Sequence, residues 1–332
     1  MEEEKKEKQA LRSVSPTPHV RDHSSTRGIM GTVIIALLPA TVVGIVHFGP
    51  RALIVILLSI LASVLSEWAY EKITKSKCTV GDLSCVLTGL LLGLNLPVSV
   101  PFWIPLLGGF FAIVVVKMLF GGLGQNFMNP ALGARCFLVL SFSRFMTDFS
   151  YTPGWSGSAD VISGATPLAA VKAGEHFDLL DMFLGFEAGT IGETSAAALL
   201  IGGLFLLACR VISWHLSFSY ILSMILFAAI FGGQGFDPQY LGAQLCGGGL
   251  MLGAFFMATD YVTRPITKKG QLIYGIFLGI LTGIFRIFGP GAEGVSYAII
   301  IGNLIVPLIE RITEPKHFGY KKPERKGKEA KA

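Results

Sequence analysis

The central part of this 332-residue chain carries very little charge. Charged residues make up 15% of the sequence, against about 25% in a typical soluble domain. Of the 49 charged residues, 11 fall within residues 1–27 and 12 within residues 310–332, so 26 remain for residues 28–309. Because the chain is also 52% hydrophobic, with a mean hydropathy of +0.62, it lacks the side chains for the surface of a soluble domain. The sequence therefore predicts a polytopic membrane protein.

Other absences exclude further classes of protein. The five cysteines contain no C-x-x-C pair and no two histidines are spaced as metal ligands, so neither a metal site nor an iron–sulfur loop is expected. The net charge of +5 lies in the two tails rather than on a patterned face, which argues against nucleic-acid binding. No G-x-G-x-x-G motif follows a strand, so the sequence shows no fingerprint of a dinucleotide site. The first 27 residues are too polar for a cleavable signal peptide.

Apolar runs predict an all-α protein with about ten transmembrane helices, since a span needs about 20 mainly apolar residues. The predicted spans are residues 29–48, 52–70, 83–96, 102–120, 129–142, 191–209, 213–231, 240–259, 271–288 and 294–309. Two of them, 83–96 and 129–142, are short and adjoin stretches rich in glycine and proline. Broken backbone is tolerated in a membrane only where it is enclosed by protein or lines a cavity. We therefore expect a bound group near these two segments.

Lysine and arginine predict the orientation, because they favour the cytoplasmic side. Their distribution predicts cytoplasmic termini and an outer position for the long hydrophilic segment 143–190. The chain then divides into a cytoplasmic N-terminal segment, a first five-helix half, an outer loop, a second five-helix half and a basic cytoplasmic tail: 1–28, 29–142, 143–190, 191–309 and 310–332. Five is odd, so any repeat of the halves would be inverted. Residues 117–124 are similar to residues 286–294, and this similarity fits an inverted repeat. It fits equally well the simpler explanation that basic side chains at helix ends extend to the membrane interface.

The segment Asp160–Lys172 contains the sharpest local motif. Thr166 is a favourable N-cap and Pro167 a favourable first helical residue, so a helix is expected to begin there. The segment is then either a capped surface helix or a place where a phosphate meets a helix N-terminus. In the second case the Thr166 hydroxyl is a candidate for a phosphate ester, and Ser163 is a rival acceptor.

Residues 121–130 form a second candidate site, rich in glycine and asparagine. The candidate residues are Gly121, Gly122, Asn126 and Asn129 of this segment, together with Lys117, which precedes it. They fit either a close contact between helices with an asparagine cap, or broken backbone and a buried base at a ligand site.

Ionisable residues at membrane depth are functional candidates by default. They are Glu67, Lys117, Arg135, Asp260 and Arg286. Glu67 and Asp260 also fit interfacial pairing, with Lys72 and Arg264 respectively. For an ion path we place Asp260 first and Asp82 second, although Asp82 also fits a simple helix cap.

A series of motifs in a fixed order extends along nearly the whole chain. They include Gly81-Asp82-Leu83-Ser84, Gly121-Gly122-Leu123-Gly124-Gln125-Asn126, Asn129-Pro130-Ala131, Ser163-Gly164-Ala165-Thr166, Gly192-Glu193-Thr194-Ser195 and Phe256-Met257-Ala258-Thr259-Asp260. Together they resemble the family of membrane proteins that includes the D component of the Rnf electron-transport complex (RnfD) and the B component of the sodium-pumping NADH:quinone oxidoreductase. The length of the chain favours the Rnf type.

The resemblance implies that a separate flavin transferase joins FMN through its phosphate to the Thr166 hydroxyl. The flanking motif residues are Ser163, Gly164, Ala165 and Asp160. Relatives also carry a non-covalent riboflavin in the membrane part, so residues 121–130 become a candidate for it without being assigned to it.

The function implied is that of one subunit, incomplete as a catalyst alone, in a ferredoxin:NAD⁺ oxidoreductase of the cell membrane that transports Na⁺ or H⁺. The expected partners are an outer FMN-bearing subunit, iron–sulfur membrane subunits and an NAD-binding subunit. Two alternatives stay open at this point, namely the quinone-reducing relative and a flavin-free secondary transporter.

Overall fold

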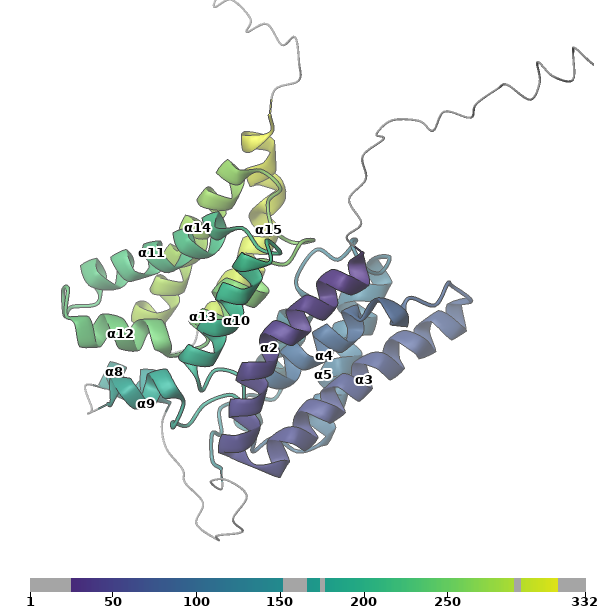
Figure 1. The fold of residues 1–332 in the computed structure, drawn as a ribbon, viewed down its shortest axis with the longest axis horizontal. Coiled ribbons are helices and arrows are strands. Elements are labelled where there is room, and N and C mark those ends of the chain that lie inside the picture. Colours follow the sequence, from purple (N-terminus) through teal and green to yellow (C-terminus); the bar gives the residue numbers. More distant parts are fainter. Residues whose placement is uncertain (1–24, 152–165, 174–176, 290–293, 316–332) are drawn as a thin grey trace, which may run out of the picture.

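The computed structural model describes residues 25–151, 166–173, 177–289 and 294–315, and the regular structure of these residues is helical apart from one isolated bridge between Pro97 and Thr190 (Figure 1). The first half contains α2 (Thr26–Phe48), α3 (Pro50–Thr74), η1 (Val80–Asp82), α4 (Ser84–Leu94), α5 (Trp103–Phe110), η2 (Phe111–Lys117), η3 (Met118–Phe120), α6 (Pro130–Ser141) and α7 (Ser143–Met146). The second contains α8 (Pro167–Ala173), α9 (Leu179–Leu184), α10 (Ala196–Ala208), α11 (Trp214–Phe231), α12 (Pro238–Cys246), α13 (Leu250–Leu252), η4 (Gly253–Met257), α14 (Lys268–Phe288) and α15 (Val295–Thr313).

The prediction of an all-helical polytopic membrane protein is confirmed. Six helices among the described residues are long and apolar enough to span a bilayer: α2, α3, the continuous stretch Trp103–Phe120, α11, α14 and α15. A seventh candidate is the pair α12 and α13–η4, bent by 60°, while α4, α6 and α10 are shorter apolar helices. All ten predicted segments are therefore helical, but four of them are too short or too bent to count as straight spans.

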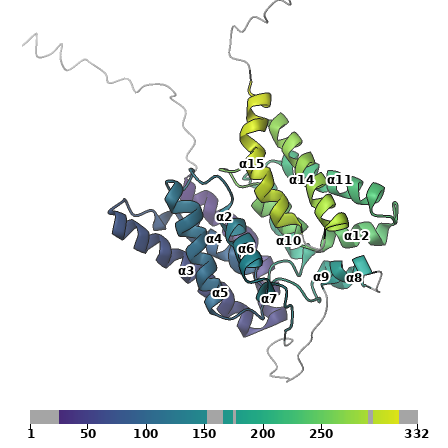
Figure 2. The ribbon, with the colours of Figure 1, turned by 180° about the vertical axis from the view of Figure 1, so that it is seen from behind.

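The helices form two neighbouring groups, α2–α6 and α10–α15, in both views of the molecule (Figures 1 and 2). The groups meet where α10 packs on α2 and α15 packs on α6. The beginning of α2 and the end of α15 lie toward one side, whereas α8 and α9 lie toward the other (Figure 1). Large apolar side chains stay exposed along α2, such as Ile35, Leu38 and Val42, as a lipid-facing surface requires. The division into domains and the inverted repeat stay predictions.

The short helix α4 ends inside the protein, and its last carbonyls find partners from far along the chain. The Ile191 amide donates to the Leu96 carbonyl at 3.1 Å, and the Gly192 amide donates to the Leu94 carbonyl at 2.7 Å. A Cβ on Gly192 would lie 2.6 Å from that of Leu94, so glycine permits this approach. Because residues 191–193 form a turn, α10 begins only at Ala196, later than the predicted span 191–209.

The bend between α12 and α13 is stabilised by a buried arginine. Gly248 and Gly249 adopt φ values of 62° and 67°, which interrupt the helix. Arg286 of α14 donates to the carbonyls of Gln244, Gly247 and Gly248 at 2.5, 2.8 and 3.0 Å. The guanidinium thus satisfies carbonyls that the break would otherwise leave without partners in a bilayer. The sequence prediction treated 240–259 as one span, although the three consecutive glycines at 247–249 are a local sign of a helix break.

Helices α11 and α14 pack closely through a row of glycines. Gly275, Gly279 and Gly283 of α14 recur every fourth residue and therefore lie on one face. They face a matching row on α11, which is Ser219, Ser223 and Phe227. Small residues let two membrane helices approach closely enough for extensive van der Waals contact.

We expect Gly279→Ala to destabilise the protein, because the added methyl would collide with the Ser223 hydroxyl. Overpacking of this kind costs about 1–3 kcal/mol. Thermal unfolding in detergent should show a lower midpoint for Gly279→Ala and an unchanged one for Gly81→Ala, where a Cβ meets no atom within 4 Å. Equal midpoints for the two variants would contradict this packing.

Candidate functional site

A cavity of about 600 Å³ lies between the two groups of helices. We name it the outer cavity after the side that the sequence predicts for residues 143–190. Helices α6, α8, α14 and α15 all contribute to its wall. The lining residues are Asn95, Arg135, Cys136, Val139, Met146, Thr147, Phe149, Thr166, Ala169, Phe285, Gly289, Ser296, Tyr297 and Ile301. The structure therefore places Thr166 at the edge of a mainly apolar space. Ser163, Gly164, Ala165 and Asp160 lie outside the described residues.

Helix α8 begins directly after Thr166, as predicted, and is fixed to the end of α14. Lys172 in its last turn donates to the carbonyls of Arg286 and Gly289 at 3.2 and 2.5 Å. Leu168 and Val171 are buried beneath the helix. These contacts hold Thr166 beside the outer cavity.

A buried ion pair stands at the wall of the outer cavity. Arg135 of α6 donates to Glu193 at 2.9 Å, and the same Nη1 donates to Asn95 and Ser296 at 2.8 and 3.0 Å. Both charged side chains are buried. In such surroundings each charge depends on the other, because an unpaired ion would be strongly disfavoured.

A smaller pocket of about 30 Å³ lies on the other side of Thr166. It is lined in part by Thr166, Glu187, Glu193, Thr194 and Gly248. Burial raises the pKa of Glu187 to about 7, and the nearby carboxylates of Asp181 and Asp178 act in the same direction. Glu187 thus titrates near neutral pH, close to Thr166.

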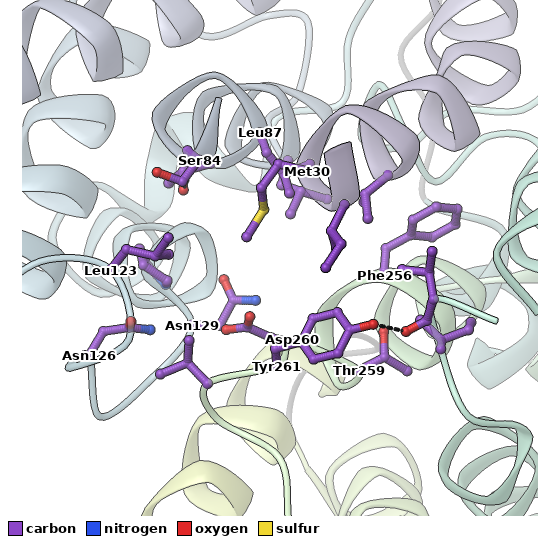
Figure 3. Close-up of a pocket in the computed structure, with 18 of the residues that line it drawn as sticks. Met30, Ser84, Leu87, Leu123, Asn126, Asn129, Phe256, Thr259, Asp260 and Tyr261 are labelled. Atoms are coloured by element: carbon purple, nitrogen blue, oxygen red, sulfur yellow. Dashed lines mark hydrogen bonds between the residues drawn. The ribbon is translucent and has the colours of Figure 1, made fainter. Parts of the chain in front are cut away.

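A second cavity, which we name the inner cavity, has a volume of about 70 Å³ and is lined in part by the beginning of α2, through Ile29, Met30 and Val33. Figure 3 shows Ser84, Asn126, Asn129 and Asp260 arranged around it. Asn129 caps α6 by accepting from the amides of Ala131 and Leu132. The cap predicted for this asparagine and its position at a cavity are therefore compatible.

Lys117 ends a π-helical turn, η2, and points into a polar cluster. Its ammonium donates to Glu67 of α3 at 2.6 Å and to Ser84 of α4 at 2.7 Å. Glu67 also accepts from Thr79 at 2.9 Å. The partner of Glu67 is thus Lys117, 50 residues away, rather than Lys72, whose ammonium lies over the Trp68 ring.

The structure brings some of the predicted site residues together and separates others. Lys117, Asn126, Asn129 and Asp260 all line the inner cavity. The turn glycines Gly121 and Gly122 have positive φ and do not line it.

The two candidates for an ion path, Asp82 and Asp260, differ in how far hydrogen bonds within the protein already occupy their carboxylates. Asp82 accepts from the amide and hydroxyl of Ser84 at 2.8 and 2.5 Å, so it serves as a helix cap. Asp260 accepts from Thr263 at 3.3 Å and lines the inner cavity, and burial raises its pKa. Asp260 is therefore the better placed of the two.

Sequence reasoning assigned no site role to Glu193 or Asn95, and no particular role to Arg135. Arg135 was noted only as an ionisable residue at membrane depth. The feature of the sequence that could have indicated its role is its position in the middle of the short helix that begins at Pro130, away from the membrane–water interface.

The fold and the cavities define a class: a polytopic helical membrane protein whose described part contains broken helices, two buried ion pairs and separate inner and outer cavities. A model of the NQR2, RnfD, RnfE family matches residues 13–319 of the chain. The chain belongs to this family.

Three curated relatives match almost end to end, and each is the D component of its complex. That of the Na⁺-translocating ferredoxin:NAD⁺ oxidoreductase complex of Acetobacterium woodii is 47% identical over 325 residues, covering 96% of this chain and 98% of the relative. That of the proton-translocating ferredoxin:NAD⁺ oxidoreductase complex of Clostridium ljungdahlii is 39% identical over 327 residues, covering 94% and 97%. That of the ion-translocating oxidoreductase complex of Stutzerimonas stutzeri is 38% identical over 330 residues, covering 89% and 93%.

Removal of the Lys117 charge should destabilise the protein, because it leaves Glu67 buried without its partner. Loss of one member of a buried pair costs about 3–5 kcal/mol. We expect Lys117→Met to lower the thermal midpoint in detergent strongly, and the double variant with Glu67→Leu to recover most of the loss. Lys77→Met, at an exposed lysine, is the control and should have no effect. A Lys117→Met variant as stable as this control would contradict the pairing.

Glu187 should make stability depend on pH. Its folded-state pKa of about 7 lies above the ordinary value of 4.5, so the folded state binds this proton more tightly than the unfolded state. This contribution is complete below about pH 4.5 and is lost as the pH rises through 7. Thermal unfolding between about pH 4.5 and 8 should therefore show a smaller decline for Glu187→Gln than for the wild type. Glu314→Gln, at an exposed acid, should behave like the wild type.

Proposed function

We propose that this chain is the RnfD-type membrane component of an ion-translocating ferredoxin:NAD⁺ oxidoreductase complex, and that it carries FMN in phosphoester linkage to Thr166. The names of the relatives support the first part. They favour it over the quinone-reducing alternative, since all three are D components of ion-translocating complexes and two are named for ferredoxin and NAD⁺. The observation that carries the second part is the position of Thr166 on the wall of the outer cavity.

The outer cavity fits FMN in size and in chemistry. Pockets for molecules of drug size measure roughly 300–1,000 Å³ and are mainly apolar with a few polar groups. The outer cavity has about 600 Å³, with Phe149, Phe285 and Tyr297 among its apolar walls. Asn95, Arg135 and Ser296 supply polar groups for the ring. When bound, FMN would supply the capacity to accept and release electrons; the chain holds the ring, orients it and excludes water.

The inner cavity does not fit a second flavin in this conformation. Its enclosed volume of about 70 Å³ holds only a few water molecules, far less than a flavin ring requires. We therefore assign no step to a riboflavin at Lys117, Gly121, Gly122, Asn126 and Asn129.

The same arrangement supports a role for Asp260 in ion transport. Its carboxylate lines the inner cavity, and the relatives are named for transport of Na⁺ in one case and of protons in another. The opposite placement of α8 and of the beginning of α2 and the end of α15 supports opposite sides of the membrane for Thr166 and the termini. The distribution of lysine and arginine supports the cytoplasm as the side of the termini. Electrons would then come from partner proteins of the complex, because this chain carries no dinucleotide-binding motif of its own.

We expect Thr166→Ala to abolish covalent flavin, because the variant lacks the hydroxyl that forms the ester. The chain would be produced together with a flavin transferase, and the fluorescence of its band read in a denaturing gel. Ser163→Ala is the matched control and should keep its fluorescence, as should Thr166→Ser in part. Undiminished fluorescence of Thr166→Ala would sink the assignment, and a wild-type band without fluorescence would favour a flavin-free transporter.

A further inference from the structure

Arg135 and Glu193 form a pair, but they face different spaces. Arg135 lines the outer cavity, whereas Glu193 lines the small pocket behind it and does not line the outer cavity. The two are joined by the 2.9 Å contact between Nη1 and Oε1. The outer cavity is thus exposed to the positive end of the pair, with the compensating carboxylate one step further away.

No other charged side chain from the described part of the chain lines the outer cavity. Lys172 is near, but its ammonium is bound to carbonyls at the end of α14. Glu187 lines only the small pocket. Arg135 is 6% exposed, so solvent screens its charge weakly. Among the described residues, the electrostatic potential within the outer cavity therefore depends mainly on how far Glu193 balances Arg135.

A guanidinium keeps its charge under all ordinary conditions, while a carboxylate in low dielectric can take up a proton. Transfer of one electron to a flavin adds one negative charge to the ring unless a proton follows. A fixed positive charge at the wall favours the reduced form, and a compensating negative charge behind it limits this effect.

We propose that the Arg135–Glu193 pair sets the reduction potential of the flavin on Thr166, with Arg135 favouring the reduced form and Glu193 moderating it. Both are positioning and tuning residues rather than catalytic ones. The inference rests on the proposed attachment of FMN to Thr166.

The test is a reductive titration of the flavinylated chain with dithionite, which supplies the electrons. The absorbance of the flavin is recorded together with that of a dye of known potential, and the comparison gives the reduction potential of the flavin. Glu193→Gln keeps the shape and an acceptor for Arg135 but removes the compensating charge. We expect it to shift the equilibrium about tenfold toward the reduced flavin, which for a one-electron couple corresponds to about 59 mV upward.

Arg135→Gln should shift the potential in the opposite direction, since it leaves only Glu193. Arg135→Lys keeps the charge and should remain within about threefold of the wild type, since a threefold change is well under the tenfold expected for a lost charge. Arg144→Gln is the control: it removes an arginine from the neighbouring helix α7, but this side chain is exposed and screened by water. Opposite shifts for Glu193→Gln and Arg135→Gln would support the proposal, because a merely structural defect would not produce them.

Gel fluorescence of the same samples distinguishes a failure of the proposed function from a failure of this inference alone. Loss of fluorescence in the wild type, or its survival in Thr166→Ala, overturns the proposed function. Retained fluorescence with an unshifted potential in Glu193→Gln overturns this inference alone, as does a shift of equal size in Arg144→Gln. If Arg135→Gln fails to fold, Glu193→Gln and Arg135→Lys still decide the question.

Discussion

Every polar group of the backbone must find its partner within the protein, because the hydrocarbon core of a bilayer offers none. This chain interrupts several helices inside its bundle, and the interruptions are closed by specific contacts. Asn129 caps α6, Arg286 binds the carbonyls at the end of α12, and residues 191–192 bind those at the end of α4. The buried polar residues therefore serve the fold first. The cavities lie beside these breaks because interrupted helices cannot pack against their neighbours as completely as continuous helices do.

The same constraint explains how the buried cations at the two cavities are arranged. Lys117 lines the inner cavity and Arg135 the outer one, and each is paired with a glutamate that does not line the same cavity. Pairing makes a charge tolerable at membrane depth, while the position of the carboxylate behind the cation leaves the positive end toward the cavity. The inner cavity differs in one respect, because Asp260 lines it as well. The outer cavity thus suits a group that gains negative charge. The inner cavity also offers the carboxylate of Asp260 to a cation.

Local features of the sequence predicted much of this architecture, and distant contacts were beyond reach. Hydropathy located all ten helical segments, and Thr166 with Pro167 marked the beginning of α8, because capping and apolar length depend on neighbouring residues. The pairing of Lys117 with Glu67 joins residues 50 positions apart, and sequence reasoning offered the nearer Lys72 instead. The bend at Gly248 and Gly249 was missed because the length and overall hydropathy of 240–259 fit one span, although three consecutive glycines stand in its middle. Glu193 was noticed only as part of a motif, since nothing local connects it to Arg135.

The relation between the two cavities bears on how such a protein would avoid a leak. Among the described residues they share no lining side chain, yet both reach Met257: the side-chain amide of Asn95, on the outer cavity, contacts its sulfur at 3.9 Å, and that of Asn129, on the inner cavity, donates to its carbonyl at 3.4 Å. Met257 is 1% exposed, so a buried side chain stands between one asparagine of each cavity. For the proposed function this separation has a clear value, because an ion needs a continuous polar path whereas an electron does not. Joined cavities would let the ion return down its gradient without doing work. The buried, apolar side chain of Met257 at this point opposes that return.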